Sequence, residues 1–185
     1  MSLAGHRHAF WALAGVAFIE SSFFPVPPDV LLAPMVLANR ARALLIAAVA
    51  TLGSVAGGLL GYVIGAWAFE TVGRVVLHFS GIEINIDSFR AMYGEWGMLI
   101  VFFAGLTPLP YKVFTIASGV AALDPATFLL ASLLSRGIRF FGEALLLRRF
   151  GEPVYLFVER NLWVFSAWFV FAVAGGLVAA HFMFS

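Results

Sequence analysis

Six ionisable residues lie within or directly beside apolar stretches of the sequence: Glu20, Asp29, Lys112, Arg136, Arg139 and Glu143. A charged side chain in a membrane interior costs about 2.5–3.5 kcal/mol, so such residues are functional candidates wherever the surrounding segment is membrane-embedded. Three of the six are acidic and three are basic, so the set can be neutral overall. Their types suit two kinds of chemistry, the binding of an anion and the uptake of protons.

Arg136, Arg139 and Glu143 follow the spacing i, i+3, i+7, which places them on one face of a helix. Arg139 and Glu143 can pair along that helix, which leaves Arg136 free for an anion. Because a guanidinium binds phosphate through two parallel hydrogen bonds, we expect a phosphate-bearing ligand, with Lys112 as a third cation. The three carboxylates would take up protons or balance charge, since burial favours the neutral form. The alternative is structural, with the six charges neutralising one another and holding the helices together.

The composition is that of an integral membrane protein. Of the 185 residues, 62% are hydrophobic and 11% are charged, whereas a soluble domain has about 45–50% and about 25%. The net charge of +1 excludes a general electrostatic attraction to nucleic acid. The chain has no cysteine, only scattered histidines, and no serine-nucleophile or metalloprotease motif. We therefore expect no enzyme activity, no metal and no cofactor.

The apolar segments are either full-length or interrupted. A spanning helix needs about 20 apolar residues, and three segments reach that length: 43–69, 126–147 and 162–183. Shorter runs stop at prolines or are too short to cross a membrane: 10–24, 30–38, 96–107 and 113–123. Residues 70–95 mix charges with apolar residues at helical spacing, which predicts an amphipathic linker at the membrane interface.

An internal repeat relates the two halves of the chain. A shift of 83 residues places FPVPPDV (24–30) over TPLPYKV (107–113). Each half has the order short apolar run, Pro-x-Pro break, short apolar run, full helix. We therefore expect one membrane domain, with a first repeat over about 9–69, a second over about 96–149, and a C-terminal transmembrane helix.

The prolines predict how each half enters the membrane. Proline removes a backbone N–H and blocks helix continuation, so the two short runs would form a re-entrant hairpin that returns to its starting side. The tips hold Pro25, Pro27 and Pro28 in the first half and Pro108 and Pro110 in the second. The alternative is a proline-kinked helix in which residues 10–38 cross. If the tips meet, Asp29 and Lys112 would form an ion pair or share a site.

Most arginines outside the apolar segments would lie on one side of the membrane in this arrangement. If both hairpins return, one side holds Arg7, Arg40, Arg42, Arg148, Arg149 and Arg160, and the other holds Arg74 and Arg90. The positive-inside rule then places the arginine-rich side and the N-terminus in the cytoplasm. The N-terminal apolar run lacks a small-residue cleavage site, so we expect it to be part of the mature protein rather than a signal peptide. One crossing separates the halves, so the hairpins enter from opposite faces as an inverted repeat.

Small and hydroxyl residues lie close to the predicted hairpins. Gly53, Gly57, Gly61 and Gly65 form a small-xxx-small ladder on one helix face, which predicts close packing against a hairpin or against a second subunit in a homo-oligomer. Most hydroxyl residues near the tips are expected to bond the backbone groups that the prolines free: Ser21, Ser22, Thr107, Thr115 and Ser118.

Together these features resemble the DedA family, also called SNARE-associated or VTT-domain membrane proteins. The resemblance is carried by Glu20, PVPPD at 25–29, GSVAGGLLGYVIG at 53–65 and FAGLTPLPYKVFTIASGVAALDPATF at 103–128. It covers about residues 18–150, and PYKVFTIASG is most similar to the YqaA-like branch. DedA-like proteins are bacterial inner-membrane proteins with two opposed re-entrant hairpins. The resemblance therefore implies that location and an all-α polytopic fold, with two inverted hairpins plus about three transmembrane helices.

The resemblance also implies that the protein moves a phospholipid or undecaprenyl phosphate between leaflets, with dependence on the proton gradient. Glu20 and Asp29 match the family's acidic pair, whereas Lys112 stands near one of its two arginines and no arginine stands near the other. Arg136 and Arg139 of the adjacent helix would supply the missing charge. Two other functions fit the sequence: a proton- or cation-coupled carrier of a small soluble solute, and a non-transporting membrane scaffold.

Overall fold

The computed structural model describes residues 7–22, 27–69, 71, 86–107, 110–151 and 153. This part of the chain consists of helices and short turns without strands, which confirms the predicted all-α class. Its elements are α1 (Arg7–Ser22), α2 (Asp29–Ala38), the 3-10 turn η2 (Arg40–Arg42), α3 (Ala43–Ala68), α5 (Ile86–Leu106), α6 (Tyr111–Val120) and α7 (Pro125–Phe150). The predicted C-terminal helix at 162–183, Pro25 and Pro108 lie outside the described residues.

The helices repeat with almost the period of the sequence match. α2 and α6 have 10 residues each, and α3 and α7 have 26 residues each. The second helix of each pair begins 82 residues after the first, from 29 to 111 and from 43 to 125. α5 begins at Ile86, so residues 86–95 belong to this helix and not to a linker, because their helical spacing continues into the apolar run that follows.

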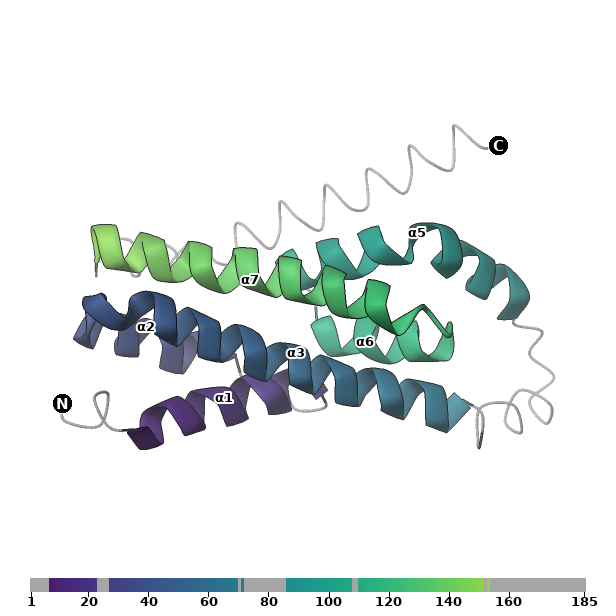
Figure 1. Ribbon diagram of the computed structural model, residues 1–185, viewed down its shortest axis with the longest axis horizontal. Coiled ribbons are helices and arrows are strands. Elements are labelled where there is room, and N and C mark those ends of the chain that lie inside the picture. The colour runs from purple at the N-terminus through teal and green to yellow at the C-terminus, as the bar shows by residue number, and fades with distance from the viewer. Residues whose placement is uncertain are drawn as a thin grey trace.

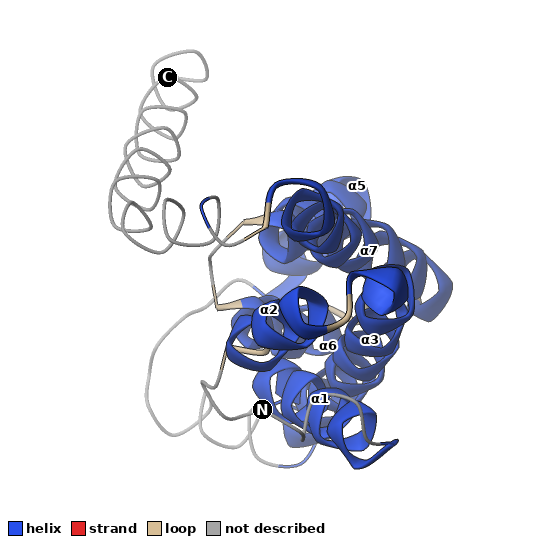
Figure 2. Cartoon of the chain, turned by 90° about the vertical axis from the view of Figure 1, so that its left-hand side faces the viewer, coloured by secondary structure: helices blue, strands red, loops and turns tan. Residues whose placement is uncertain are grey.

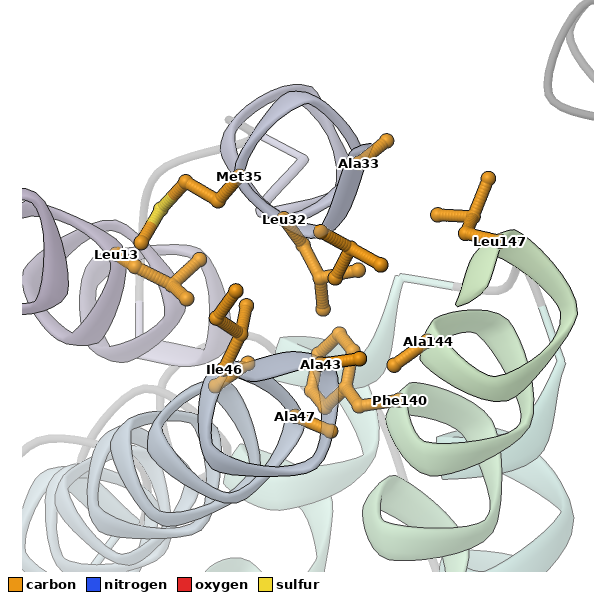
Figure 3. Close-up of a cluster of buried hydrophobic side chains, with 12 residues drawn as sticks. Leu13, Leu32, Ala33, Met35, Ala43, Ile46, Ala47, Phe140, Ala144 and Leu147 are labelled. Atoms are coloured by element: carbon orange, nitrogen blue, oxygen red, sulfur yellow. The ribbon is translucent and has the colours of Figure 1, made fainter. Parts of the chain in front are cut away.

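Each half folds back on itself (Figure 1). Leu13, near the start of α1, shares a buried cluster with Leu32 and Met35 of α2, as Figure 3 shows. In the second half, Gly97 of α5 lies against the side chain of Leu123, which follows α6. The chain therefore reverses at both tips. The alternative of a single kinked helix through residues 10–38 is wrong, because a continuous helix would hold the start of α1 far from the end of α2.

The two halves are interlocked through their long helices. α3 and α7 run antiparallel along the bundle and contact each other (Figure 1). α3 also packs on α1 of its own half and on α6 of the other half, while α7 packs on α5 and on α2 in the same way. The described residues that flank the tips lie beside the middle of the long helices, because Ser22 donates to the Gly57 carbonyl of α3. Arg139 of α7 donates in the same way to Asp29 and to the Thr107 carbonyl. The two hairpins enter the bundle from opposite ends (Figure 1).

α3 is the most apolar of the long helices. Within the described residues, Arg40–Ala68 is the one helical stretch long and apolar enough to cross a membrane, judged by length and composition alone. α7 has the same length as α3 but carries charged residues at its middle and its end. It therefore does not have the apolar composition that a spanning helix normally has.

The glycine ladder of α3 is used inside the chain. A Cβ on Gly53 or Gly57 would collide with the α1 backbone at Ala14 or Phe18. A Cβ on Gly61 or Gly65 would collide with Thr115 or the Ile116 carbonyl in α6. Of the two predicted partners for this face, the hairpins are the ones that occupy it. A second subunit would have to displace α1 and α6 to reach the same surface, so this face does not support the predicted homo-oligomer.

Asp124 caps the N-terminus of α7. Its Oδ2 accepts hydrogen bonds from the Thr127 N–H at 2.8 Å and from the Thr127 hydroxyl at 2.9 Å. We expect Asp124→Ala to lower the melting temperature of the purified protein by about 2–4 °C, because an N-cap side chain satisfies a backbone donor that nothing else reaches. Asp124→Asn should keep most of the stability, since asparagine also caps helices. Circular dichroism at neutral pH measures both variants.

The effect of Asp124 should disappear in acid. The hydrogen bond from the Thr127 N–H, followed by that from its hydroxyl, holds the pKa of Asp124 below its ordinary value of 3.8. A depressed pKa in the folded state means that the stabilisation is complete above the unfolded pKa and is lost as the pH falls through the folded pKa. A difference between wild type and Asp124→Ala that stays constant well below pH 3.8 would contradict this account.

Candidate functional site

Arg136 lies near the middle of α7, and its side chain is 1% exposed. Its Nη2 donates to Glu20 Oε2 at 2.8 Å, and its Nε donates to Ser54 Oγ at 2.6 Å. The ring centroids of Tyr111 and Phe140 each lie 4.8 Å from its Cζ. A carboxylate, a hydroxyl and two aromatic rings, drawn from four helices, therefore hold the guanidinium. Its Nη1 has no hydrogen-bond partner.

Buried hydroxyl groups extend this centre. Ser21 Oγ and Ser54 Oγ share a hydrogen bond of 2.6 Å, and Ser21 Oγ also donates to Glu20 Oε2 at 3.1 Å. The Tyr111 hydroxyl donates to Ser132 Oγ at 2.5 Å. The other predicted hydroxyl residues donate to backbone carbonyls three or four residues earlier in the chain: Ser22, Thr107, Thr115 and Ser118. Ser21 is the exception, because its hydroxyl belongs to the ion-pair network.

Arg139 connects the two tips. Its Nη2 donates to Asp29 Oδ2 at 2.9 Å, and its Nη1 donates to the Thr107 carbonyl at 3.4 Å. Asp29 begins α2 after the first tip, and Thr107 follows α5 at the second. This ion pair is more accessible than that of Arg136, since the Arg139 and Asp29 side chains are 24% and 33% exposed. Asp29 Oδ1 has no hydrogen-bond donor.

Glu143 brings a second carboxyl group to Asp29. It lies one helical turn after Arg139, and its carboxyl group is close enough to that of Asp29 for the two to repel each other when both are charged. Two carboxyl groups at close range favour a state in which one of them carries a proton, because like charges repel. The site can therefore hold an exchangeable proton beside an arginine. Over the described ranges, no group of three histidine, cysteine, aspartate or glutamate residues could hold a metal ion.

The pairing of charges differs from the sequence prediction in two respects. Arg139 forms its ion pair with Asp29 rather than along its own helix with Glu143, and Arg136 is not free because it already forms an ion pair. The predicted partner of Asp29 was Lys112, which lies half-buried in the first turn of α6. The carboxylates of the first half pair with arginines of α7 because α7 packs against both hairpins, which brings its arginines within reach of them.

The described prolines of the tips lie where helices begin. The Pro28 carbonyl accepts hydrogen bonds from the N–H groups of Leu31 and Leu32, and the Pro110 carbonyl accepts one from Val113. Proline suits this position because the first N–H groups of a helix have no partner within it. The prolines, Pro27 among them, thus set where α2 starts beside Arg139 and where α6 starts beside Arg136.

The sequence prediction named Glu20 but missed the other groups that hold Arg136. Ser54 carries a partial signal, because it is one of few hydroxyls in a long charge-free helix and it lies beside the glycine ladder. Tyr111 and Phe140 carry none, because aromatic residues are common throughout this chain. Their contacts with the guanidinium depend on how α6 packs on the rest of the bundle.

Two bacterial proteins are similar to this chain over most of their length. One from Haemophilus influenzae is 35% identical over 183 residues, which cover 99% of this chain and 93% of that protein. One from Histophilus somni is 39% identical over 140 residues, which cover 76% of this chain and 73% of that protein. This chain belongs to their family. Both relatives are described only as uncharacterized proteins, no protein-family model matches the chain, and no solved structure matches it.

The extent of the family match is informative in itself. The similarity to the Haemophilus influenzae member covers nearly the whole chain, so it includes both hairpins and both long helices. The similarity is thus not confined to one short motif. Within this member of the family, the polar centre lies where the two halves of the repeat meet.

Proposed function

We propose that this protein is a polytopic, DedA-like membrane protein that moves a phosphate-headed lipid between leaflets and that proton uptake accompanies the movement. The observation that carries this proposal is the position of Arg139, which is bonded to both tips and is partly exposed. A lipid phosphate that binds this guanidinium would take the place of Asp29. Binding would thereby loosen the contact between the two halves, which is the kind of change a transporter needs.

The outer surface supports a membrane location. Many large apolar side chains on the long helices are exposed, among them Leu52, Trp67, Leu130, Leu134 and Ile138. Soluble monomers rarely expose contiguous apolar surface on this scale. In a bilayer these side chains would face lipid, while the charged groups would stay in the interior between the hairpins. The arginines of η2 and of the end of α7 then favour a cytoplasmic position for that end of the bundle.

The two arginines would have different roles. Arg139 and Lys112 are the better candidates for direct contact with the headgroup, because both side chains are partly accessible. Arg136 is enclosed, so it would act mainly by holding Glu20 and by adding positive charge to the site. Its unpartnered Nη1 leaves one donor for a ligand oxygen or a water molecule.

The carboxyl groups offer a route for proton coupling. If a phosphate takes Arg139, Asp29 loses its cationic partner and a proton would compensate the charge. Glu143 lies close to Asp29 and could supply or share that proton. Glu20 would keep its ion pair with Arg136. Lipid and proton would therefore compete around one arginine, which is a simple basis for coupling.

A non-transporting scaffold is the second candidate, and one observation favours it. Glu20 and Asp29 are each paired internally with an arginine, as a purely structural network would require. The accessibility of the Asp29–Arg139 pair is the feature that a scaffold does not explain. A carrier of a small soluble solute has no such specific support.

Lipid movement in proteoliposomes tests the proposal. The wild type should move labelled phosphatidylethanolamine or a short polyprenyl phosphate, and a pH gradient should change the rate. Asp29→Asn and Arg139→Gln should each slow movement roughly tenfold or more, because a charge-assisted hydrogen bond is worth about 1.5–3 kcal/mol. Gly142→Ala is the matched control on α7, since nothing lies within 4 Å of the added methyl group.

Two results would count against lipid transport. One is unchanged movement in folded Asp29→Asn and Arg139→Gln proteins. The other is no movement of either lipid by folded wild type, which would favour the scaffold. Glu143→Gln separates coupling from transport, because it should keep lipid movement while weakening its dependence on the pH gradient.

A further inference from the structure

One end of the bundle carries exposed arginines that the interior site does not use. Arg40 and Arg42 lie in η2, and Arg148 and Arg149 lie in the last turn of α7. All four are exposed, and η2 contacts α7, so the four cations share one surface. Figure 2 views the bundle from this end. We call these four residues the arginine end.

The described carboxylates do not neutralise the arginine end. Within the part of the chain that the structure describes, the ion pairs join Glu20 and Asp29 to the arginines of the interior, and none includes the arginine end. The described exposed carboxylates lie on elements of the opposite end: Asp87 and Glu95 are in the first half of α5, and Asp124 is at the α6–α7 turn (Figure 1). Charge is therefore distributed unevenly along the bundle.

Helix ends account for only one of the four arginines. The Arg40 guanidinium lies against Gly151, which ends α7 with φ +70° and has no side chain to exclude it. It can therefore interact with the carbonyl end of α7. However, α2 and α7 end at this side of the bundle while α1 and α3 begin there (Figure 1), so the helix dipoles largely cancel. Arg42, Arg148 and Arg149 have no described anionic partner.

Exposed apolar side chains flank the arginines: Leu44, Leu45, Leu145, Leu146 and Phe150. An arginine beside exposed apolar surface suits a membrane interface, where its stem contacts hydrocarbon and its guanidinium reaches the headgroups. A soluble anion or an acidic protein would not require this apolar border. The combination of charge and border favours a lipid surface.

We propose that the arginine end binds the phosphodiester headgroups of anionic phospholipids in the leaflet that it faces. This inference uses the membrane location of the proposed function but not lipid movement. Binding is measured without transport, so failure of one does not imply failure of the other. Clusters of basic residues at a membrane surface attract anionic lipids in this way.

To test the inference, lipid is added to the purified full-length protein, and the melting temperature is measured at each lipid concentration. Phosphatidylglycerol should raise the melting temperature at lower concentration than phosphatidylcholine, and added salt should reduce the difference. Arg42→Gln/Arg148→Gln/Arg149→Gln should weaken phosphatidylglycerol binding on the order of a hundredfold, from about fivefold per arginine. Arg40 is left intact because it packs on Gly151.

The controls separate charge, lipid and folding. The matching triple lysine variant keeps the positive charges and should bind phosphatidylglycerol nearly as well as wild type. Equal affinity of wild type for both lipids, unchanged affinity in the glutamine variant, or equal loss in the lysine variant would each overturn the inference. An equal effect of inorganic phosphate would overturn the assignment to lipid. If the triple glutamine variant does not fold, Arg148→Gln/Arg149→Gln gives the same comparison with a smaller expected loss.

Discussion

Arg136→Gln is expected to lower the free energy of unfolding by about 3–5 kcal/mol, because it leaves a largely buried carboxylate without its cationic partner. Glu20 is 18% exposed and Arg136 is 1% exposed, so little solvent is available to replace the lost interaction. Ser54 also loses its guanidinium donor. Equilibrium unfolding in mixed micelles measures the loss.

Two comparisons decide whether the buried pair causes that loss. Arg139→Gln should destabilise less, because Arg139 and Asp29 are 24% and 33% exposed and solvent screens them. Glu20→Gln combined with Arg136→Gln should recover part of the stability, since no uncompensated charge remains. If Arg136→Gln and Arg139→Gln lose stability equally, or if the double variant recovers none, the ion pair is not the source of the effect.

Gly57→Ala is expected to cost about 1–3 kcal/mol of stability, because the added methyl group would overlap the Phe18 carbonyl of α1. The atom it meets belongs to the backbone of a packed helix, so the strain cannot be relieved by a side-chain rotation. α1 and α3 would have to move apart, and Glu20 would move with α1 away from Arg136. Thermal or denaturant unfolding measures the stability.

Gly15→Ala is the matched control for this change. Gly15 lies in α1, and nothing lies within 4 Å of a methyl group at that position. Replacing glycine by alanine inside a helix stabilises it by about 0.5–1 kcal/mol when there is room. The two substitutions should therefore change stability in opposite directions. Equal effects would mean that the close approach of α3 to α1 is not required.

Local features of the sequence determined the elements and the period of the fold. Closely spaced prolines disfavour a continuous helix, so the breaks at the tips and the lengths of the apolar runs could be read directly, whereas the single Pro34 lies inside α2 without ending it. The repeat follows because both halves contain the same order of these features. The candidate residues were also readable, because a charge in an apolar segment is conspicuous on its own. The boundary between the linker and α5 could not be read from the sequence, because the amphipathic spacing continues into α5.

Only the tertiary structure decided how the charges are paired. Spacing along one helix suggested that Arg139 pairs with Glu143, yet its partner Asp29 is 110 residues away, and Glu20 is 116 residues from Arg136. These pairs exist because glycines let α3 pack closely on α1 and α6, and because α7 packs on α2 and α3. The sequence identifies the charged groups that need a partner in an apolar interior, whereas the packing of the helices determines which groups come close enough to pair with them.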